Sequence, residues 1–265
     1  MMLSIKQVYK TFNPGTVNEK KALSNLNLEL EKGDFVTIIG GNGAGKSTML
    51  NMIAGVYPID RGSIILDGVD ISRKPEHSRA WLLGRVFQDP MMGTASDMEI
   101  QENLAMAFRR GRRRGLGWGI KKEEKALYRE KLRILDLGLE DRMTAKVGLL
   151  SGGQRQALTL LMATLQDPKL LLLDEHTAAL DPKTAKKVLA ITQEIVASKN
   201  LTAMMVTHNM KDAIAYGNRL IMMHEGRIIY DVAGEEKKIL KVADLLEKFE
   251  TVSGEEFAND RMLLN

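Results

Sequence analysis

Gly40-Gly-Asn-Gly-Ala-Gly-Lys-Ser47 is the stretch of the 265-residue chain that limits its fold most narrowly. It fits the pattern G-x-x-x-x-G-K-[ST], and it lies between a short β-branched run, 35–39, and a predicted helix, 46–54, that ends before Gly55. Glycines allow successive backbone N–H groups to turn toward one anion, and the positive end of the helix dipole lies at the same point. The stretch therefore predicts a phosphate-binding loop between a strand and a helix.

Two polar side chains in this stretch have separate expected roles. The Lys46 ammonium is placed to neutralise the β- and γ-phosphates of a nucleotide, and the Ser47 hydroxyl is placed to bind Mg²⁺. A glycine-rich turn that only caps a helix is the alternative, and such a turn would bind no phosphate. On the first interpretation, the nucleotide-binding residues of the stretch are Gly40, Gly41, Asn42, Gly43, Ala44, Gly45, Lys46, Ser47 and Thr48.

A carboxylate that holds the metal ion is expected at the end of a buried strand. Leucines occupy positions 170–173, and Asp174 and Glu175 follow directly. Four apolar residues in succession suit a strand that is buried on both faces. Asp174 is expected to reach Mg²⁺ through water, and Glu175 to orient or deprotonate the water that attacks a phosphate. An apolar strand that ends in two acids is often structural when it stands alone, so its meaning depends on the loop at 40–47.

The third motif, Leu150-Ser-Gly-Gly-Gln154, opens a predicted helix about twenty residues before that strand. Its local interpretation is a capping box, with the Ser151 side chain at the N-cap and Gln154 three residues later. Two glycines after the serine also leave N–H groups open to an incoming phosphate. Both interpretations can hold together.

Taken in order and spacing, the three motifs resemble those of the ATPase subunit of an ABC transporter, and the resemblance covers about residues 3–231. It implies that two such chains, or this chain and a homologous ATPase, dimerise head to tail. Each ATP would then lie between the P-loop of one subunit and the signature motif of the other. The resemblance places Ser151, Gly152 and Gly153 at the γ-phosphate held by the partner, and it includes Gln154 among the nucleotide-binding residues.

The same resemblance implies roles for single residues that carry little information alone. Gln88 matches the Q-loop glutamine, which senses Mg²⁺ and couples to the membrane domain, and His208 matches the switch histidine at the γ-phosphate. Asp181 matches the D-loop, which crosses the dimer interface. Phe12 stands where the family stacks an aromatic ring on adenine, with Tyr9 as a less favoured candidate. The catalytic residues implied are Lys46, Glu175 and His208, and the magnesium ligands are Ser47, Gln88 and Asp174.

Two positions depart from the family pattern. His176 stands where proline usually follows the catalytic glutamate, and it either fills a loop position or tunes Glu175. Met162 stands where arginine is common, so a family ion pair is expected to be absent. Neither change removes a phosphate or metal contact.

The expected fold is α/β, with a P-loop NTPase (RecA-like) core, an N-terminal antiparallel β piece and an inserted helical subdomain. Strand-like runs at 35–39, 63–66, 82–87, 170–173, 201–206 and 220–223 alternate with helical stretches, including 182–197, as in a largely parallel sheet. The first 30 residues suggest short strands joined by the turn at Asn13-Pro-Gly15.

Two domain boundaries are predicted. Residues 1–231 form the ATPase domain, with the helical subdomain inserted at about 91–146, and 232–265 form a C-terminal helical extension. Within the extension, apolar residues lie on one face of a predicted helix that packs on the core. They are Ile239, Val242, Ala243, Leu246 and Phe249.

Composition excludes several classes of protein. The hydrophobic fraction is 44% and the charged fraction 27%, which is ordinary for a globular protein. The absence of cysteine excludes disulfides, thiolate metal sites and a cysteine nucleophile. No apolar run approaches the roughly 18 residues of a membrane span, and residues 1–10 lack the apolar core of a signal peptide.

The formal charge of +4 is concentrated in one short segment. Five arginines lie between Arg109 and Arg114, and without them the charge is 4 − 5 = −1, so a whole-chain affinity for nucleic acid is not indicated. The segment, with Trp118 close behind, is interpreted either as a loop that is solvated or docked on acidic residues of the permease, or as a contact with anionic lipid headgroups. Nucleic-acid binding is the least favoured alternative.

The resemblance implies ATP hydrolysis that drives transport, at the cytoplasmic face of the cell membrane, with a separate permease. The segment 144–149 is short, which favours an importer. The stretch 174–181 resembles that of uptake ATPases that work with a separate permease and a substrate-binding lipoprotein, and this resemblance implies a small polar solute such as an amino acid. An exporter of lipid or lipoprotein is the alternative, and a non-transport ATPase that acts on nucleic acid is less favoured.

Overall fold

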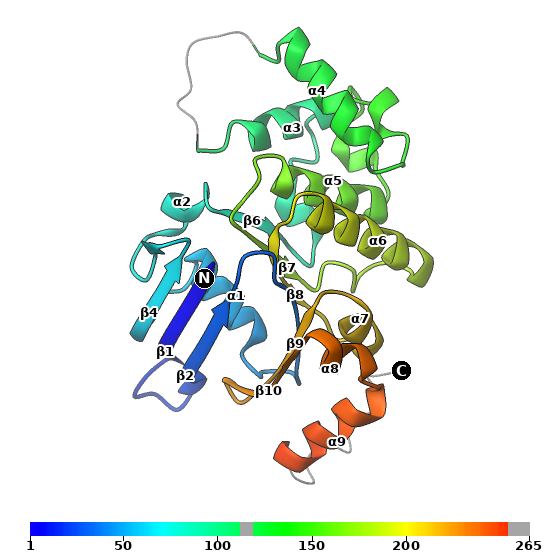
Figure 1. Ribbon diagram of the computed structural model, residues 1–265. Coiled ribbons are helices and arrows are strands. Elements are labelled where there is room, and N and C mark those ends of the chain that lie inside the picture. The colour runs from blue at the N-terminus through cyan, green and yellow to red at the C-terminus, as the bar shows by residue number, and fades with distance from the viewer. Residues whose placement is uncertain (112–118, 254–265) are drawn as a thin grey trace.

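A six-stranded, largely parallel sheet forms the centre of the fold (Figure 1). The structure is a computed structural model, and it describes residues 1–111 and 119–253. The strands of this sheet are β3 (Phe35–Ile39), β6 (Leu83–Val86), β7 (Leu170–Asp174), β8 (Thr202–Val206), β9 (Arg219–His224) and β10 (Arg227–Ala233). Their order is β10-β9-β3-β8-β7-β6, in which β9 and β10 are antiparallel and the other neighbours are parallel. The predicted α/β class is confirmed.

A second, antiparallel sheet is built mainly from the start of the chain. Its strands are β1 (Leu3–Phe12), β2 (Lys20–Leu30), β4 (Arg61–Leu66) and β5 (Val69–Asp70), in the order β2-β1-β4-β5. The antiparallel pair β1–β2 was expected, and the turn between the strands begins at Asn13. The run 63–66 was read as part of the alternating pattern, but it lies in β4 and pairs with β1 instead. Sequence periodicity gives no information about which sheet a short strand joins.

Nine α-helices surround the two sheets in the described part of the chain. Their bounds are α1 (Lys46–Ala54), α2 (Glu76–Arg79), α3 (Ile100–Phe108), α4 (Lys122–Arg133), α5 (Gly152–Thr164), α6 (Pro182–Ser198), α7 (Met210–Ala215), α8 (Gly234–Ile239) and α9 (Val242–Ser253). Short 3₁₀ turns lie at Pro90–Gly93, Leu139–Asp141 and Val147–Leu149. Within 1–111 and 119–253, none of the helices combines the length and the apolar character that a membrane span needs.

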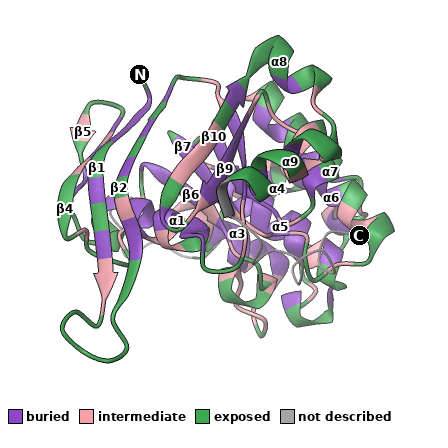
Figure 2. Ribbon diagram, turned by 90° about the horizontal axis from the view of Figure 1, so that it is seen from below, coloured by how far each residue is buried: buried purple, intermediate pink, exposed green. Residues whose placement is uncertain are grey.

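Each face of the parallel sheet packs against a different layer, and Figure 2 shows that the central strands are mostly buried. Leu171 and Leu173 on β7 join a buried cluster with α3, α4, α5 and α6. Leu170 and Leu172 point the other way and join a cluster with α1 and the antiparallel sheet. This alternation follows from the two-residue period of a strand. It confirms the expectation that the leucine run is buried on both faces.

The helices between β6 and α5 form the upper end of the molecule in Figure 1. Ile100 and Leu104 of α3, with Tyr128 and Leu132 of α4, are fully buried against α5. The segment is helical, as its composition indicated. Its treatment as an inserted subdomain stays a prediction.

The C-terminal extension differs from its predicted form. It contains two helices, α8 and α9, separated by Leu240 and Lys241, rather than one continuous helix. The break separates Ile239 from the stripe, and Ile239 is 77% exposed. Within α9, Ala243 is exposed, whereas Leu245, which was not predicted, is fully buried. Phe249 is buried as expected.

Candidate functional site

The loop at 40–47 follows β3 directly and bends where a side chain would not fit. Gly40 has a φ of 150°, and a Cβ there would lie 2.2 Å from the carbonyl oxygen of Met223. Gly45 has a φ of 98°, and a Cβ there would lie 2.6 Å from the carbonyl oxygen of Ala22. Glycine is therefore required at both ends of the loop, because these contacts are with backbone atoms that cannot move aside.

Lys46 is the first residue of α1, and its side chain folds back across the loop. Its Nζ donates to the carbonyl oxygens of Gly40 at 2.7 Å and Gly41 at 3.1 Å, and the residue is only 5% exposed. Among the described residues, no side chain caps the start of α1. The ammonium group and the positive end of the helix dipole therefore face the same small volume, which suits a phosphate group.

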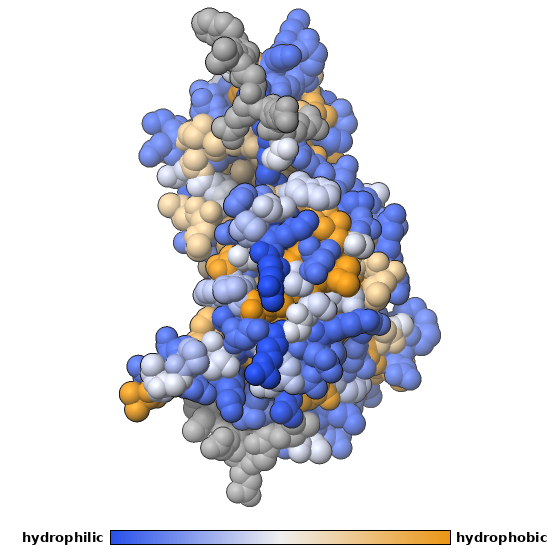
Figure 3. Space-filling model, turned by 90° about the vertical axis from the view of Figure 1, so that its left-hand side faces the viewer, coloured by the Kyte–Doolittle hydropathy of each residue, from blue (hydrophilic) through white to orange (hydrophobic). Residues whose placement is uncertain are grey.

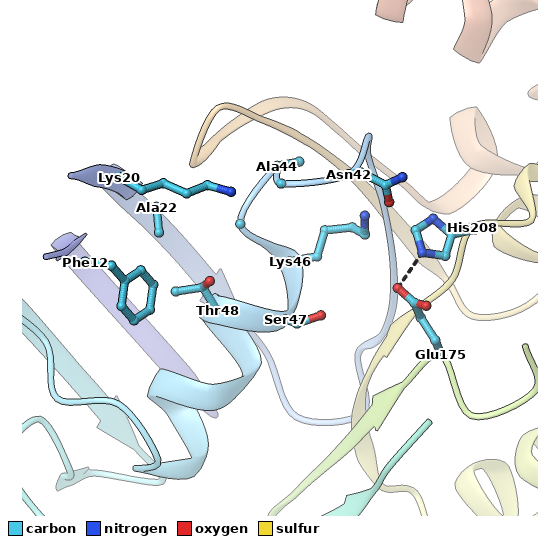
Figure 4. A pocket seen from close by; sticks show the side chains of 12 residues that line it. Phe12, Lys20, Ala22, Asn42, Ala44, Lys46, Ser47, Thr48, Glu175 and His208 are labelled. Atoms are coloured by element: carbon cyan, nitrogen blue, oxygen red, sulfur yellow. Dashed lines mark ion pairs between the residues drawn. The ribbon is translucent and has the colours of Figure 1, made fainter. Parts of the chain in front are cut away.

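This volume is a pocket of about 300 Å³ (Figure 4). It brings together residues from four distant parts of the chain: Phe12 of β1, residues 42–48, Glu175 and His208. All of these were predicted as nucleotide-site residues. The pocket also contains Lys20 and Ala22 of β2, which were not predicted. Lys20 points toward the loop in Figure 4, and no local motif marks it, because only the pairing of β1 with β2 brings it there.

The predicted magnesium ligands Ser47 and Asp174 meet at the end of β7. The Ser47 hydroxyl donates to Asp174 Oδ1 at 3.2 Å. Burial raises the pKa of Asp174, and the hydrogen bond from Ser47 partly opposes this effect. A hydroxyl and a carboxylate oxygen are suitable Mg²⁺ ligands, since the ion takes one or two protein oxygens and fills its other positions with phosphate and water. The two residues therefore fit the ion, and their role as ligands stays a prediction.

Glu175 and His208 form a close pair beside the phosphate-binding loop, as the dashed line in Figure 4 shows. His208 Nε2 lies 2.6 Å from Glu175 Oε1. The hydrogen bond from His208 lowers the pKa of Glu175, although burial acts in the opposite direction. Glu175 is therefore held as a carboxylate, which is the form that orients a water molecule or accepts its proton.

Phe12 is better placed than Tyr9 for an aromatic contact with a ligand. Phe12 lines the pocket and packs edge-to-face on Tyr57, with ring centroids 5.1 Å apart. Tyr9, from the same strand, does not line it. The structure thus supports the first of the two candidates, and stacking on adenine stays a prediction.

Several predicted residues do not line this pocket. Gln88 is exposed, and Ser151 and Gln154 begin α5 at another part of the surface. The expected capping box is present: Ser151 Oγ accepts from the Gln154 backbone N–H at 3.3 Å, and the Ser151 N–H donates to Gln154 Oε1 at 3.1 Å. Gly152 is exposed, and Gly153 adjoins Thr184 of α6. Their proposed contact with a nucleotide held by a partner stays a prediction.

Asp181 has a structural role in the monomer. Its side chain caps α6 by accepting from the backbone N–H groups of Lys183 at 3.2 Å and Thr184 at 3.1 Å. The hydrogen bond to Thr184 lowers the pKa of Asp181. This cap fixes the start of α6, and the expected role of Asp181 in a D-loop at a dimer interface stays a prediction.

His176 is buried and faces α6 rather than solvent. Its Nε2 lies 3.1 Å from Thr192 Oγ1, and the Thr192 hydroxyl donates to the Val188 carbonyl oxygen at 2.8 Å. The histidine therefore donates in this contact. Burial lowers the pKa of His176 to about 4, so the ring is neutral near pH 7. Of the two alternatives, the structure supports a packing role rather than one that tunes Glu175.

The arginine cluster is only partly within the described residues. Arg112, Arg113, Arg114 and Trp118 lie outside them. Arg109 pairs with Glu124 at 2.8 Å, and Arg110 Nη2 donates to the Ala163 carbonyl oxygen at 3.5 Å. These two arginines are therefore engaged within the fold. Met162 is 9% exposed on α5, and as a methionine it forms no ion pair.

Comparisons with known proteins identify similar chains. A family model described as ABC transporter matches residues 23–178. A tyrosine transport ATP-binding protein of Clostridioides difficile is 46% identical over 94% of this chain and 99% of its own length. A methionine import ATP-binding protein of Bartonella henselae is 33% identical over 86% of this chain and 64% of its own length. A solved dimeric ATP-binding cassette bound to ADP and phosphate superposes with a TM-score of 0.74, at 30% identity over 88% of this chain and 98% of that one.

Proposed function

Because the chain belongs to the ABC transporter family, we propose that it is the ATP-hydrolysing subunit of a system that imports an amino acid. The observation that carries the proposal is the pocket shared by the 42–48 loop, Glu175 and His208. The loop at 42–48 and the Glu175 carboxylate line the same pocket, which supports phosphate binding beside a group that can activate water. The solute class follows from the relative that is named for tyrosine transport.

The residues at the site have separate roles in hydrolysis. Lys46 and the N–H groups at the start of α1 stabilise negative charge on the transferred phosphoryl group. Ser47 and Asp174 would hold Mg²⁺, which would supply further positive charge at the phosphate oxygens. Glu175 orients the attacking water and accepts its proton, while His208 donates a hydrogen bond that fixes Glu175 in place.

The proposed assembly is a head-to-tail pair of cassettes on a separate permease at the cytoplasmic face of the membrane, with a substrate-binding lipoprotein. The solved relative is dimeric, and the related chains are named for transport or import. The position of Ser151 supports this arrangement, because it lies away from the pocket of its own chain. In a head-to-tail pair, it would close the pocket of the partner.

Transport into proteoliposomes tests the solute and the direction together. The chain is purified from its native membrane in the complex that it forms there, and uptake of labelled tyrosine and methionine is followed with and without ATP. We expect ATP-dependent uptake of tyrosine. The Glu175→Gln variant should lower both uptake and ATP turnover by at least about 100-fold while still binding ATP, because only the general base is lost.

Glu194→Gln is the matched control, since Glu194 is an exposed glutamate on α6, and it should leave both rates unchanged. ATP-driven efflux would identify an exporter instead. Uptake of neither amino acid would refute tyrosine and methionine as solutes, and full turnover by Glu175→Gln would refute the assignment of the base.

A further inference from the structure

The two helices of the C-terminal extension pack against α7, the short helix that directly follows the loop of His208. Met210 and Ala213 of α7 share a buried cluster with Leu245 and Phe249 of α9. Figure 1 shows α7, α8 and α9 side by side at the same end of the molecule. The extension therefore covers the apolar face of α7.

α7 depends on such contacts for its position. It has six residues, and helices of this length are unstable in isolation because nucleation is unfavourable. One contact comes from the sheet, where the Thr37 hydroxyl of β3 donates to the Ala213 carbonyl oxygen at 2.8 Å. The other comes from the extension, where Lys237 Nζ donates to the carbonyl oxygens of Tyr216 and, at 3.0 Å, Gly217, just past the end of α7.

Lys237 makes this contact although a lysine side chain is unfavourable in a buried position. It is only 2% exposed, and burial lowers its pKa to about 8. Burying an ammonium group is unfavourable unless it is well hydrogen-bonded. A cation at the C-terminal end of a helix also interacts favourably with the helix dipole. The hydrogen bonds of Lys237 therefore tie the residues just past α7 to the extension.

A displacement of α7 would be transmitted to His208. His208 is followed by Asn209, whose side chain caps α7 by accepting from the N–H groups of Lys211 at 2.9 Å and Asp212 at 3.2 Å. The His208 side chain is 40% exposed, and its 2.6 Å contact with Glu175 depends on where this loop lies. Catalytic geometry is sensitive to displacements of this size.

We propose that Lys237, supported by Leu245 and Phe249, is a positioning residue for hydrolysis: the C-terminal extension holds α7 in place and so sets the contact between His208 and Glu175. This inference rests on the proposed role of the Glu175–His208 pair.

Lys237→Met tests the proposal, with Lys238→Met as the matched control, because Lys238 is the adjacent lysine and is exposed. We expect Lys237→Met to lower kcat for ATP about tenfold, with the KM for ATP within about twofold of the wild-type value. The imidazole NMR signal of His208 in histidine-labelled protein, assigned from its loss in His208→Ala, should shift, while that of His77 should not. Lys238→Met should change neither property.

An unchanged His208 signal and kcat in folded Lys237→Met would overturn the proposal, as would a rise in KM that accounts for the whole loss. Equal losses in Lys238→Met would do the same. If Lys237→Met does not fold by circular dichroism, Leu245→Val takes its place, with Ile239→Val at the exposed position as control. Wild-type turnover by His208→Ala would instead refute the proposed role of the pair itself.

Discussion

Glu175 has a backbone conformation that is unfavourable for folding but suits catalysis. Its φ is 47°, in the left-handed region that non-glycine residues rarely adopt. Its backbone N–H donates to the Val206 carbonyl oxygen at 3.1 Å, and its carboxylate is held by His208. The neighbouring strand β8 thus stabilises a conformation that directs the carboxylate into the pocket rather than along β7. Such a strained residue at the end of a buried strand is consistent with a functional constraint.

His176, the next residue, makes the stability of the chain depend on pH. Its folded-state pKa of about 4 lies below the usual 6.5, so the unfolded chain binds more protons between these values. The stability contributed by the neutral, buried ring is therefore complete above pH 6.5 and is lost as the pH falls toward 4. We expect the free energy of unfolding, measured by urea titration, to fall by about 2 kcal/mol between pH 7 and pH 5 through this residue.

His176→Gln should remove this part of the pH dependence, because glutamine does not titrate and can still donate to Thr192. His77→Gln is the control, since His77 is exposed. A pH profile of His176→Gln that remains parallel to that of the wild-type protein would contradict the prediction.

At the scale of single elements, the contact between α5 and α6 shows why a glycine can be required for packing. A Cβ on Gly153 would lie 2.0 Å from Thr184 Cγ2, and the β-branched threonine has little freedom to move away. Gly153→Ala should therefore destabilise the chain by about 1–3 kcal/mol. Thermal or urea unfolding measures the effect.

Thr184→Ser is the matched second change, because it removes the Cγ2 methyl group and retains the hydroxyl. In the double variant most of the lost stability should return, since the clash is gone and alanine is favoured in helices. A double variant no more stable than Gly153→Ala would exclude this clash as the cause. ATPase assays of the stable double variant would then report on the role of Gly153 in nucleotide contact separately from its role in packing.

The bounds of a helix were predicted best where glycines mark its ends, because few other residues suit those positions. Lys46–Ala54 was predicted as a helix with the bounds that the structure has, because the loop glycines and Gly55 mark both ends. The C-terminal stripe was wrong at Ile239, because the break at Leu240 and Lys241 has no strong sequence marker. It was also wrong at Ala243, because the buried face of α9 includes Leu245 instead. Lys20 was not predicted, since its place at the pocket depends on the register of β1 and β2.

At the scale of the whole molecule, the sheet topology gathers the pocket at one edge. The parallel strands β3, β7 and β8 are neighbours, so the residues that follow their carboxyl ends, namely 40–47, Glu175 and His208, converge there. This convergence was predictable from the motifs, because neighbouring parallel strands have their carboxyl ends at the same edge of the sheet. The place of Ser151 relative to the pocket was not derivable from the spacing of the motifs. It was implied only by the resemblance to the family.

The pocket that contains Lys46 and the start of α5 at Ser151 lie at different parts of one chain, and this separation allows a test of the assembly. If the pocket of one chain is completed by Ser151 of another, Lys46→Met and Ser151→Arg should each abolish turnover, because every site in either homodimer lacks one part. In a mixed dimer, the pocket of the Ser151→Arg chain meets the intact signature of the Lys46→Met chain. One of the two sites is then complete.

Mixing the two inactive proteins in equal amounts should therefore restore ATP turnover to about a quarter of the wild-type value per chain, since half of the dimers are mixed and each has one working site. The measurement is phosphate release at a protein concentration at which the wild-type chain dimerises. In the control mixture, Lys183→Met replaces Lys46→Met, because Lys183 is an exposed lysine at the start of α6. Turnover should remain high in this mixture, since the Lys183→Met chain keeps both an intact pocket and an intact Ser151. No recovery in the Lys46→Met mixture would mean that each chain completes its own site, and the head-to-tail arrangement would be wrong.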